Sequence, residues 1–229
     1  MLIFVHGFNN RFSEAAERAM VLKNAVGNDT EVLFWSWPSK RDGLAGNYWY
    51  DKESVGGSAR QSFVRFLRAL KEGSNTSSLN LLAHSMGSWH AMGALQTLSD
   101  DNSRPTLQNV VLAAPDVPSD EFMLALPDLS HVARRNTLYA CEWDWALRMS
   151  REMNAYPRAG TGGDADILVN DKVESIDVDA TLSINHSYVF QAGRVLSDLS
   201  TLILTGSDAD ARGLFRRAKA SWHYWRFHS

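Results

Sequence analysis

The segment between Leu79 and Gly93 constrains the fold of this chain more than any other. It is an apolar run that breaks between Ala83 and Gly87 and then continues with helical spacing, which predicts a buried strand, a sharp turn and a helix. A serine on such a strained turn, here Ser85, projects its hydroxyl above the edge of a sheet. Ala83 stands where this kind of turn usually has glycine, and alanine is the least costly departure. The other interpretation is an ordinary connection in which Ser85 caps a helix; we favour the nucleophile-bearing turn.

Short apolar runs alternate with helical periodicities along the rest of the chain. The run Leu2–Val5 has no polar position, which suits a strand buried on both faces of a parallel sheet. The alternation predicts one α/β domain over residues 1–229, with a doubly wound, mainly parallel sheet of about six strands and helices on both faces. We expect strands at about 2–5, 31–36, 79–83, 108–114, 136–141 and 173–178.

Three segments depart from this simple alternation. Residues 39–57 contain glycine, asparagine and adjacent aromatic residues, and they are expected to form an irregular loop. Pro127 is expected to interrupt a short helix that begins near Ser119. Beyond Gly206 we expect a terminal helix that ends in the aromatic tail 222–228.

The composition argues against several classes of function. The net charge of −3 offers no overall attraction to nucleic acid or to an anionic membrane, and no apolar run approaches the ~20 residues that span a bilayer. The single cysteine, Cys141, forbids an internal disulfide and a cysteine-based zinc site. The first residues lack a basic region and a cleavage site. These features favour a cytoplasmic protein, unless an upstream signal has been removed, with neither nucleic acid nor membrane as its main partner.

The polar residues that follow the predicted strands are the candidates for chemistry. In a parallel sheet, the loops after the strands lie on one rim, and four such residues are Ser85, Asp116, Asp144 and His186. A serine hydroxyl needs a base to take its proton, and His186 is placed to reach across the rim toward Ser85. An acid must orient that imidazole. Asp144 and Asp116 both remain open for this role, because Asp144 would also serve as a helix cap and Asp116 as a turn residue; we favour Asp144.

The order of nucleophile, acid and histidine resembles the α/β-hydrolase superfamily, over residues 1–204. Five segments are similar, more narrowly, to a small bacterial branch of hydrolases of unknown function: Val5–Asn9, Phe34–Pro38, His84–Gly87, Ala114–Asp116 and Asp144–Ser150. The resemblance implies that the acid is Asp144 and that the backbone amides of Met86 and Phe8 form an oxyanion hole. It also implies that the first strand corresponds to the superfamily's third, so that residues 31–36 lie at a sheet edge.

These residues predict a serine hydrolase, most simply a carboxylesterase that cleaves small to medium acyl esters through an acyl-serine intermediate. No metal and no cofactor are needed, and the expected partner is a small-molecule ester. A thioesterase, a lipase or an acyltransferase would use the same residues. The alternative from a different functional class is a non-catalytic binding or scaffolding protein with this fold. It is favoured by Ala83 and by the absence, which the resemblance implies, of the superfamily's first two strands.

Tryptophan is frequent in this chain, with eight residues in 229. Trp35, Trp37, Trp143 and Trp145 follow strands, where they are expected either to form the wall of an acyl pocket or to pack the core. The aromatic and basic tail is expected to pack against the body of the domain. A homo-oligomer through the exposed sheet edge or through this tail remains open.

Overall fold

The computed structural model describes residues 1–39, 45–73, 78–101, 107–179 and 185–228, and its framework is one open sheet. Among these residues, eight strands lie in the order β2-β1-β3-β4-β5-β6-β8-β7. They are β1 (Leu2–Val5), β2 (Val32–Trp35), β3 (Asn80–His84), β4 (Leu107–Ala113), β5 (Ala133–Ala140), β6 (Glu174–Asp177), β7 (Phe215–Lys219) and β8 (Trp222–Arg226). Neighbouring strands are parallel except for the β7–β8 hairpin. The predicted α/β class with a mainly parallel sheet is confirmed.

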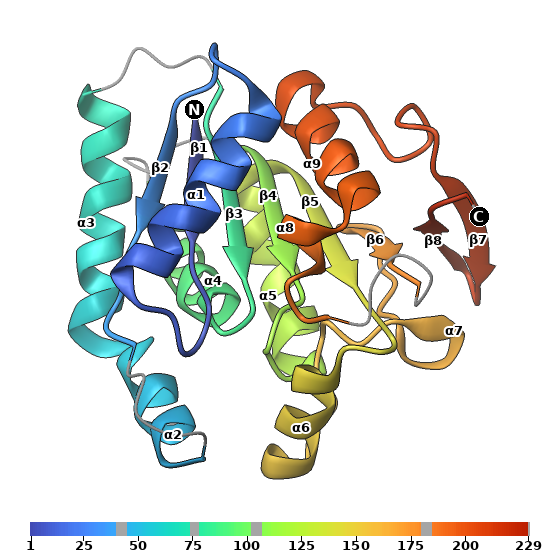
Figure 1. Ribbon diagram of the computed structural model, residues 1–229, viewed down its shortest axis with the longest axis horizontal. Coiled ribbons are helices and arrows are strands. Elements are labelled where there is room, and N and C mark those ends of the chain that lie inside the picture. Colours follow the sequence, from blue (N-terminus) through green and yellow to red (C-terminus); the bar gives the residue numbers. More distant parts are fainter. Residues whose placement is uncertain (40–44, 74–77, 102–106, 180–184, 229) are drawn as a thin grey trace.

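Helices cover both faces of this sheet (Figure 1). On one face lie α1 (Phe12–Val26), α8 (Tyr188–Gln191) and α9 (Gly193–Thr205), and on the other lie α3 (Gly57–Gly73), α4 (Gly87–Leu98) and α5 (Ser119–Val132). Two further helices, α2 (Ala45–Ser54) and α6 (Trp145–Asn154), lie beyond the ends to which the strand arrows point, and α7 (Gly163–Asp166) is a single turn. The rim that carries the candidate residues therefore lies next to α2 and α6.

The first strand illustrates why the sheet is buried on both sides. Leu2 and Phe4 belong to the core beneath α1 and α9, whereas Ile3 and Val5 belong to the core beneath α3, α4 and α5. Side chains of a strand alternate between its two faces, so a strand between two helical layers needs apolar residues at every position. This is the pattern that the sequence shows there.

The C-terminal tail forms a strand pair where the sequence analysis predicted a helix, and that prediction is wrong. Strand β8 joins the open edge of β6, and Arg226 of β8 donates to the buried carboxylate of Asp177 at 2.6 and 2.8 Å. Ala220 takes a left-handed conformation (φ 51°) in the tight turn between β7 and β8. The hairpin explains why the sheet has eight strands instead of about six, and it places the tail against the body of the domain.

Two other expectations also need correction. Within residues 39–57, expected to be a loop, Ala45–Ser54 forms helix α2, while residues 40–44 lie outside the described part of the chain. Pro127 does not end its helix, because α5 continues through it to Val132. Proline removes one backbone hydrogen bond, but Leu126 and Leu129 on either side of it are buried in the core and hold the helix in place.

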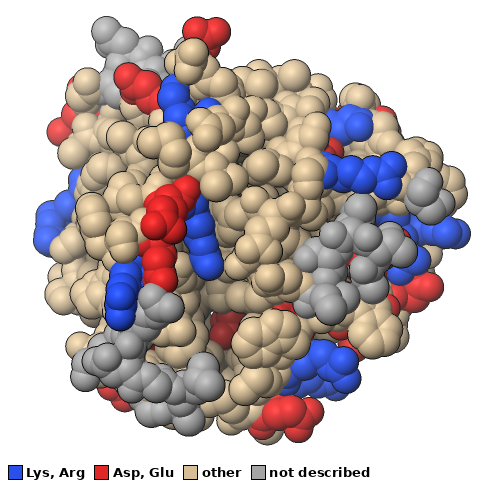
Figure 2. Space-filling model, viewed as in Figure 1, with Lys and Arg blue, Asp and Glu red and all other residues tan. Residues whose placement is uncertain are grey.

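Strand β2 forms one edge of the sheet, as the resemblance implied. On the face in Figure 2, described acidic and basic side chains are scattered, and neither charge gathers in one large area. None of the described helices is both long enough and apolar enough to cross a membrane.

Candidate active site

Ser85 lies on a strained turn between β3 and α4. Its backbone is in the left-handed region (φ 55°), and its amide donates to the carbonyl of Ala113 on β4 at 2.9 Å. Glycines let the neighbouring segments approach closely. A Cβ atom on Gly7 would lie 2.7 Å from Ser85 Cβ, and one on Gly87 would lie 2.2 Å from the carbonyl oxygen of His6. The turn therefore packs directly against the loop that follows β1.

His186 and Asp144 form a hydrogen-bonded pair on the same rim. His186 Nδ1 lies 2.7 Å from Asp144 Oδ2, and the carboxylate is buried. The other oxygen, Oδ1, accepts hydrogen bonds from the amides of Ala146 at 3.0 Å and Leu147 at 3.2 Å, which begin α6. Asp144 is thus both the cap of α6 and the partner of His186. Two helix amides stabilise its negative charge and fix the oxygen that faces the imidazole.

Asp116, the alternative acid, is not brought to His186. Its carboxylate accepts hydrogen bonds from Ser150 Oγ at 2.5 Å and Tyr48 Oη at 3.0 Å, and Arg158 Nε lies 3.3 Å away. Burial, and then the charge of Asp116, raises the pKa of Tyr48 to about 12, so this hydroxyl stays protonated and donates. Asp116 therefore joins α2 to α6 and is not the partner of the histidine.

The two amides predicted for an oxyanion hole come from neighbouring segments. Met86 follows Ser85 at the start of α4, and Phe8 lies in the loop after β1. Within the described ranges, neither amide donates a hydrogen bond to another backbone carbonyl outside regular helix and strand bonding. The side chain of Asn10 holds the loop, because its amide donates to the carbonyl of Gly7 at 3.1 Å and of Phe8 at 2.7 Å. Two amides in such positions suit a developing negative charge.

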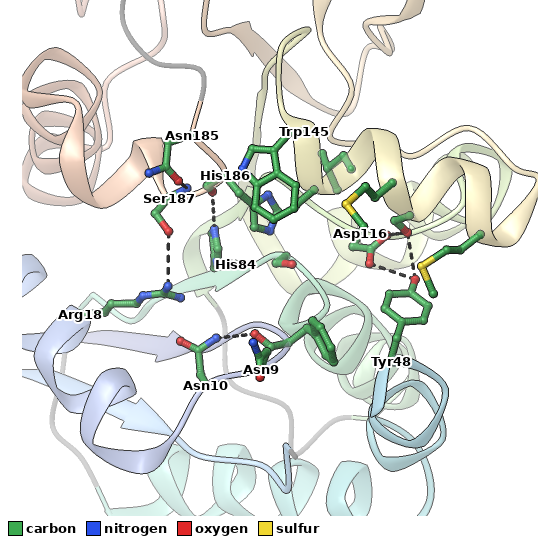
Figure 3. A pocket seen from close by; sticks show the side chains of 17 residues that line it. Asn9, Asn10, Arg18, Tyr48, His84, Asp116, Trp145, Asn185, His186 and Ser187 are labelled. Carbon is green, nitrogen blue, oxygen red and sulfur yellow. Dashed lines mark hydrogen bonds between the residues drawn. The ribbon is translucent and has the colours of Figure 1, made fainter. Parts of the chain in front are cut away.

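Ser85 and His186 line one cavity of about 310 Å³ (Figure 3). In this view Arg18, Asn10 and Ser187 lie on one side, and Tyr48 and Asp116 lie on the other. The Ser85 hydroxyl makes no hydrogen bond within the described part of the chain; such bonds often tighten only when substrate binds. Nor do any three His, Cys, Asp or Glu side chains of the described residues group as metal ligands would.

The sequence matches the model of one protein family over residues 1–203, and that family is described as alpha/beta hydrolases of unknown function (DUF900). The chain belongs to this alpha/beta hydrolase family. No curated protein matches the sequence.

Solved structures have the same fold as this alpha/beta hydrolase. An uncharacterized protein from Bacillus cereus matches with a TM-score of 0.53 and 13% identity over 88% of this chain, which spans 59% of that protein's length. A protein from Listeria innocua matches with a TM-score of 0.50 and 12% identity, covering 91% of this chain and 95% of that one. A carboxylesterase from Bacillus subtilis matches with a TM-score of 0.49 and 11% identity, covering 90% and 84%. At such identities the first two likenesses show the fold alone.

Three of the four tryptophans predicted for the pocket wall lie outside the cavity of this alpha/beta hydrolase. Trp35 packs on Phe63 and Phe66 with ring centroids 5.1 and 5.2 Å apart. Trp37 is buried, and its Nε1 donates to the carbonyl of His6 at 2.7 Å. Neither they nor the half-exposed Trp143 line the cavity, so the prediction that these three bind substrate is not supported. A position after a strand is therefore not enough to place a residue in the cavity, because its side chain must also point inward.

The cavity contains the fourth of these tryptophans and also residues that were not predicted to lie there. Trp145 lines it from α6, and Arg18, which was not predicted, lines it from α1. His84, next to the serine, also lines it, and its Nε2 donates a 2.9 Å hydrogen bond to the backbone carbonyl of His186. Burial lowers the pKa of His84 well below its usual value, so its ring is neutral. Arg18 had no local signal, because a single arginine on an amphipathic helix is ordinarily a surface residue.

Gly7→Ala tests the close packing at the turn. The added methyl group would lie 2.7 Å from Ser85 Cβ, so we expect a loss of about 1–3 kcal/mol in the free energy of unfolding, with slower labelling of the serine by a fluorophosphonate. Urea unfolding and labelling rates measure the two effects. Gly193→Ala is the control, because a Cβ there has no neighbour within 4 Å. Equal behaviour of the two variants would contradict the close approach.

Proposed function

We propose that this chain is a serine hydrolase and, more narrowly, a carboxylesterase for small to medium acyl esters. The observation that carries the proposal is the 2.7 Å contact between His186 Nδ1 and the buried carboxylate of Asp144. His186 lines the same cavity as Ser85, whose backbone has the left-handed conformation of a strained turn. The family supports a hydrolase. A nucleophile, a base and an acid on one rim support the choice of a serine mechanism.

The reaction follows from the roles of these groups. The hydroxyl oxygen of Ser85 attacks the carbonyl carbon while His186 Nε2 accepts its proton, and Asp144 stabilises the resulting imidazolium. The amides of Met86 and Phe8 donate to the oxyanion, a stabilisation worth roughly 2.7–4 kcal/mol for each donor. The imidazolium returns the proton to the departing alcohol. Water, deprotonated by His186, then attacks the acyl-serine and releases the acid.

The size of the cavity supports a substrate of modest length. Its volume of about 310 Å³ is at the small end of the range of roughly 300–1,000 Å³ for ligand pockets. Several apolar side chains line it from α6, among them Leu147 and Met149. Such a lining suits an acyl chain.

The test combines covalent labelling with a panel of esters. A fluorophosphonate should add once to the folded protein, as measured by intact mass. Among p-nitrophenyl esters from acetate to laurate, we expect kcat/KM to be highest between butanoate and octanoate and to fall at laurate. A folded protein that neither labels nor turns over any ester would support the non-catalytic binding protein instead.

A further inference from the structure

One side of the cavity holds a cation whose position is fixed. Arg18 extends from α1, and its Nη2 donates to Ser187 Oγ at 3.3 Å. Its guanidinium carbon lies 5.3 Å from the centre of the Phe190 ring. These two contacts orient the group toward the cavity (Figure 3).

The guanidinium of Arg18 is incompletely satisfied. Its Nη1 is buried and has no hydrogen-bond partner in the described part of the chain. Burial lowers the pKa of Arg18, with Glu14 acting in the opposite direction, but a guanidinium remains protonated at neutral pH. Burying a charged donor without a partner is unfavourable, so this arrangement is one that an anion would stabilise.

Two arginines with buried side chains differ from Arg18 in having carboxylate partners, whereas Arg60 on α3 also has a buried Nε without a hydrogen-bond partner among the described residues. Arg212 lies 2.8 Å from Asp198, and Arg158 lies 3.3 Å from Asp116. Among the described residues, no carboxylate lies within ion-pair distance of Arg18. The described residues therefore supply no paired carboxylate for this cation, and Glu14, four residues earlier on α1, acts on it through its charge alone.

Charge and polarity are distributed unequally around Ser85. The one carboxylate among the described lining residues, Asp116, lies on the side opposite Arg18. Helix α6 contributes Trp145, Met149 and Met153, which are spaced four residues apart and all line the cavity. The serine thus shares its cavity with a cation, Arg18, and with the apolar side chains of α6.

We propose that Arg18, with the hydroxyl of Ser187, binds an anionic group of the substrate, a carboxylate or a phosphate. The substrate is then an ester whose apolar acyl chain lies along α6 and whose alcohol carries the negative charge. This inference rests on the proposed function, since it assigns the substrate class of the same site. The reaction is unchanged: the acyl carbon–oxygen bond breaks, water supplies the hydroxyl of the acid, and the anionic alcohol leaves with the proton from His186.

A matched pair of esters tests the proposal. 4-Butanoyloxybenzoate and 4-butanoyloxybenzamide share the acyl chain and the ring and differ in charge, and 4-butanoyloxyphenyl phosphate supplies the phosphate case. We expect Arg18→Gln to lower the ratio of kcat/KM for anionic over neutral ester at least tenfold, mainly through KM. Comparing this ratio between variants cancels the intrinsic reactivity of each ester. Arg18→Lys should retain part of the preference.

The control is Arg65→Gln, because Arg65 is exposed on α3 and also donates to a serine hydroxyl, that of Ser62. This variant should leave the ratio unchanged. A ratio in Arg18→Gln that stays within twofold of the wild-type ratio would overturn the proposal. Whether the carboxylate ester or the phosphate ester loses more kcat/KM in this variant shows which anion the site prefers.

Calorimetry separates this proposal from the proposed function. 4-Hydroxybenzoate or 4-hydroxyphenyl phosphate should bind the wild type at least tenfold more tightly than 4-hydroxybenzamide, and Arg18→Gln should remove that difference. Anion binding without turnover of any ester would contradict the hydrolase and retain the anion site. Turnover without any preference for the anion would contradict the anion site alone.

Discussion

Ser85→Ala should abolish ester turnover and fluorophosphonate labelling while leaving the protein folded. The expected loss in kcat is on the order of 10⁶-fold, the size found when a serine protease loses its nucleophile. The free energy of unfolding should change little, because the Ser85 hydroxyl makes no hydrogen bond among the described residues and alanine meets the same left-handed backbone. Ester hydrolysis assays measure kcat, intact mass measures labelling, and urea unfolding measures the free energy of unfolding.

Ser88→Ala is the matched control for this variant. Ser88 lies in the first turn of α4, and its buried hydroxyl donates to the carbonyl of Ala83 at 3.2 Å. Its loss should cost about 0.5–1.5 kcal/mol of stability and leave labelling intact. Labelling that persists in Ser85→Ala, or disappears in Ser88→Ala, would refute the assignment of Ser85 as nucleophile.

Asp144→Asn should lower kcat by roughly 10⁴-fold, the loss caused by the corresponding change in a serine protease triad. The reason is the hydrogen bond to His186 Nδ1: an amide NH₂ at this position would favour the wrong tautomer of the imidazole. Stability should be nearly preserved, because asparagine caps helices about as well as aspartate and retains an oxygen for the amides that begin α6. The measurements are kcat on p-nitrophenyl butanoate and urea unfolding.

Asp116→Asn should have the opposite pattern. It removes the negative charge beside the fully buried guanidinium of Arg158, and breaking a buried ion pair costs about 3–5 kcal/mol. Tyr48 and Ser150 retain an acceptor, so kcat of the folded fraction should stay within about tenfold. If Asp116→Asn instead loses as much activity as Asp144→Asn without unfolding, the assignment of the acid is wrong.

For Asp116 and Asp144, the sequence predicted the position on the rim but did not decide which of the two contacts His186. Both follow strands of a parallel sheet, so both were predicted on the rim, and both are there. Only the tertiary structure separates them, because the helix that Asp144 caps turns its free oxygen toward His186, whereas Asp116 is held by Tyr48 and Arg158. These contacts join residues 42 or more positions apart in the chain, and no local pattern encodes them.

The sequence by itself determined the mainly parallel α/β sheet and the turn that carries Ser85. Both depend on neighbouring residues: fully apolar runs that require burial on two faces, and small residues beside a strained serine. The tertiary structure decided the rest. The tail became β7 and β8 because the edge of β6 offered partners for its backbone and Asp177 for Arg226. Trp145 and Arg18 reached the cavity because of the direction of their helices. Side-chain direction and the pairing of distant segments arise only when the whole chain is packed.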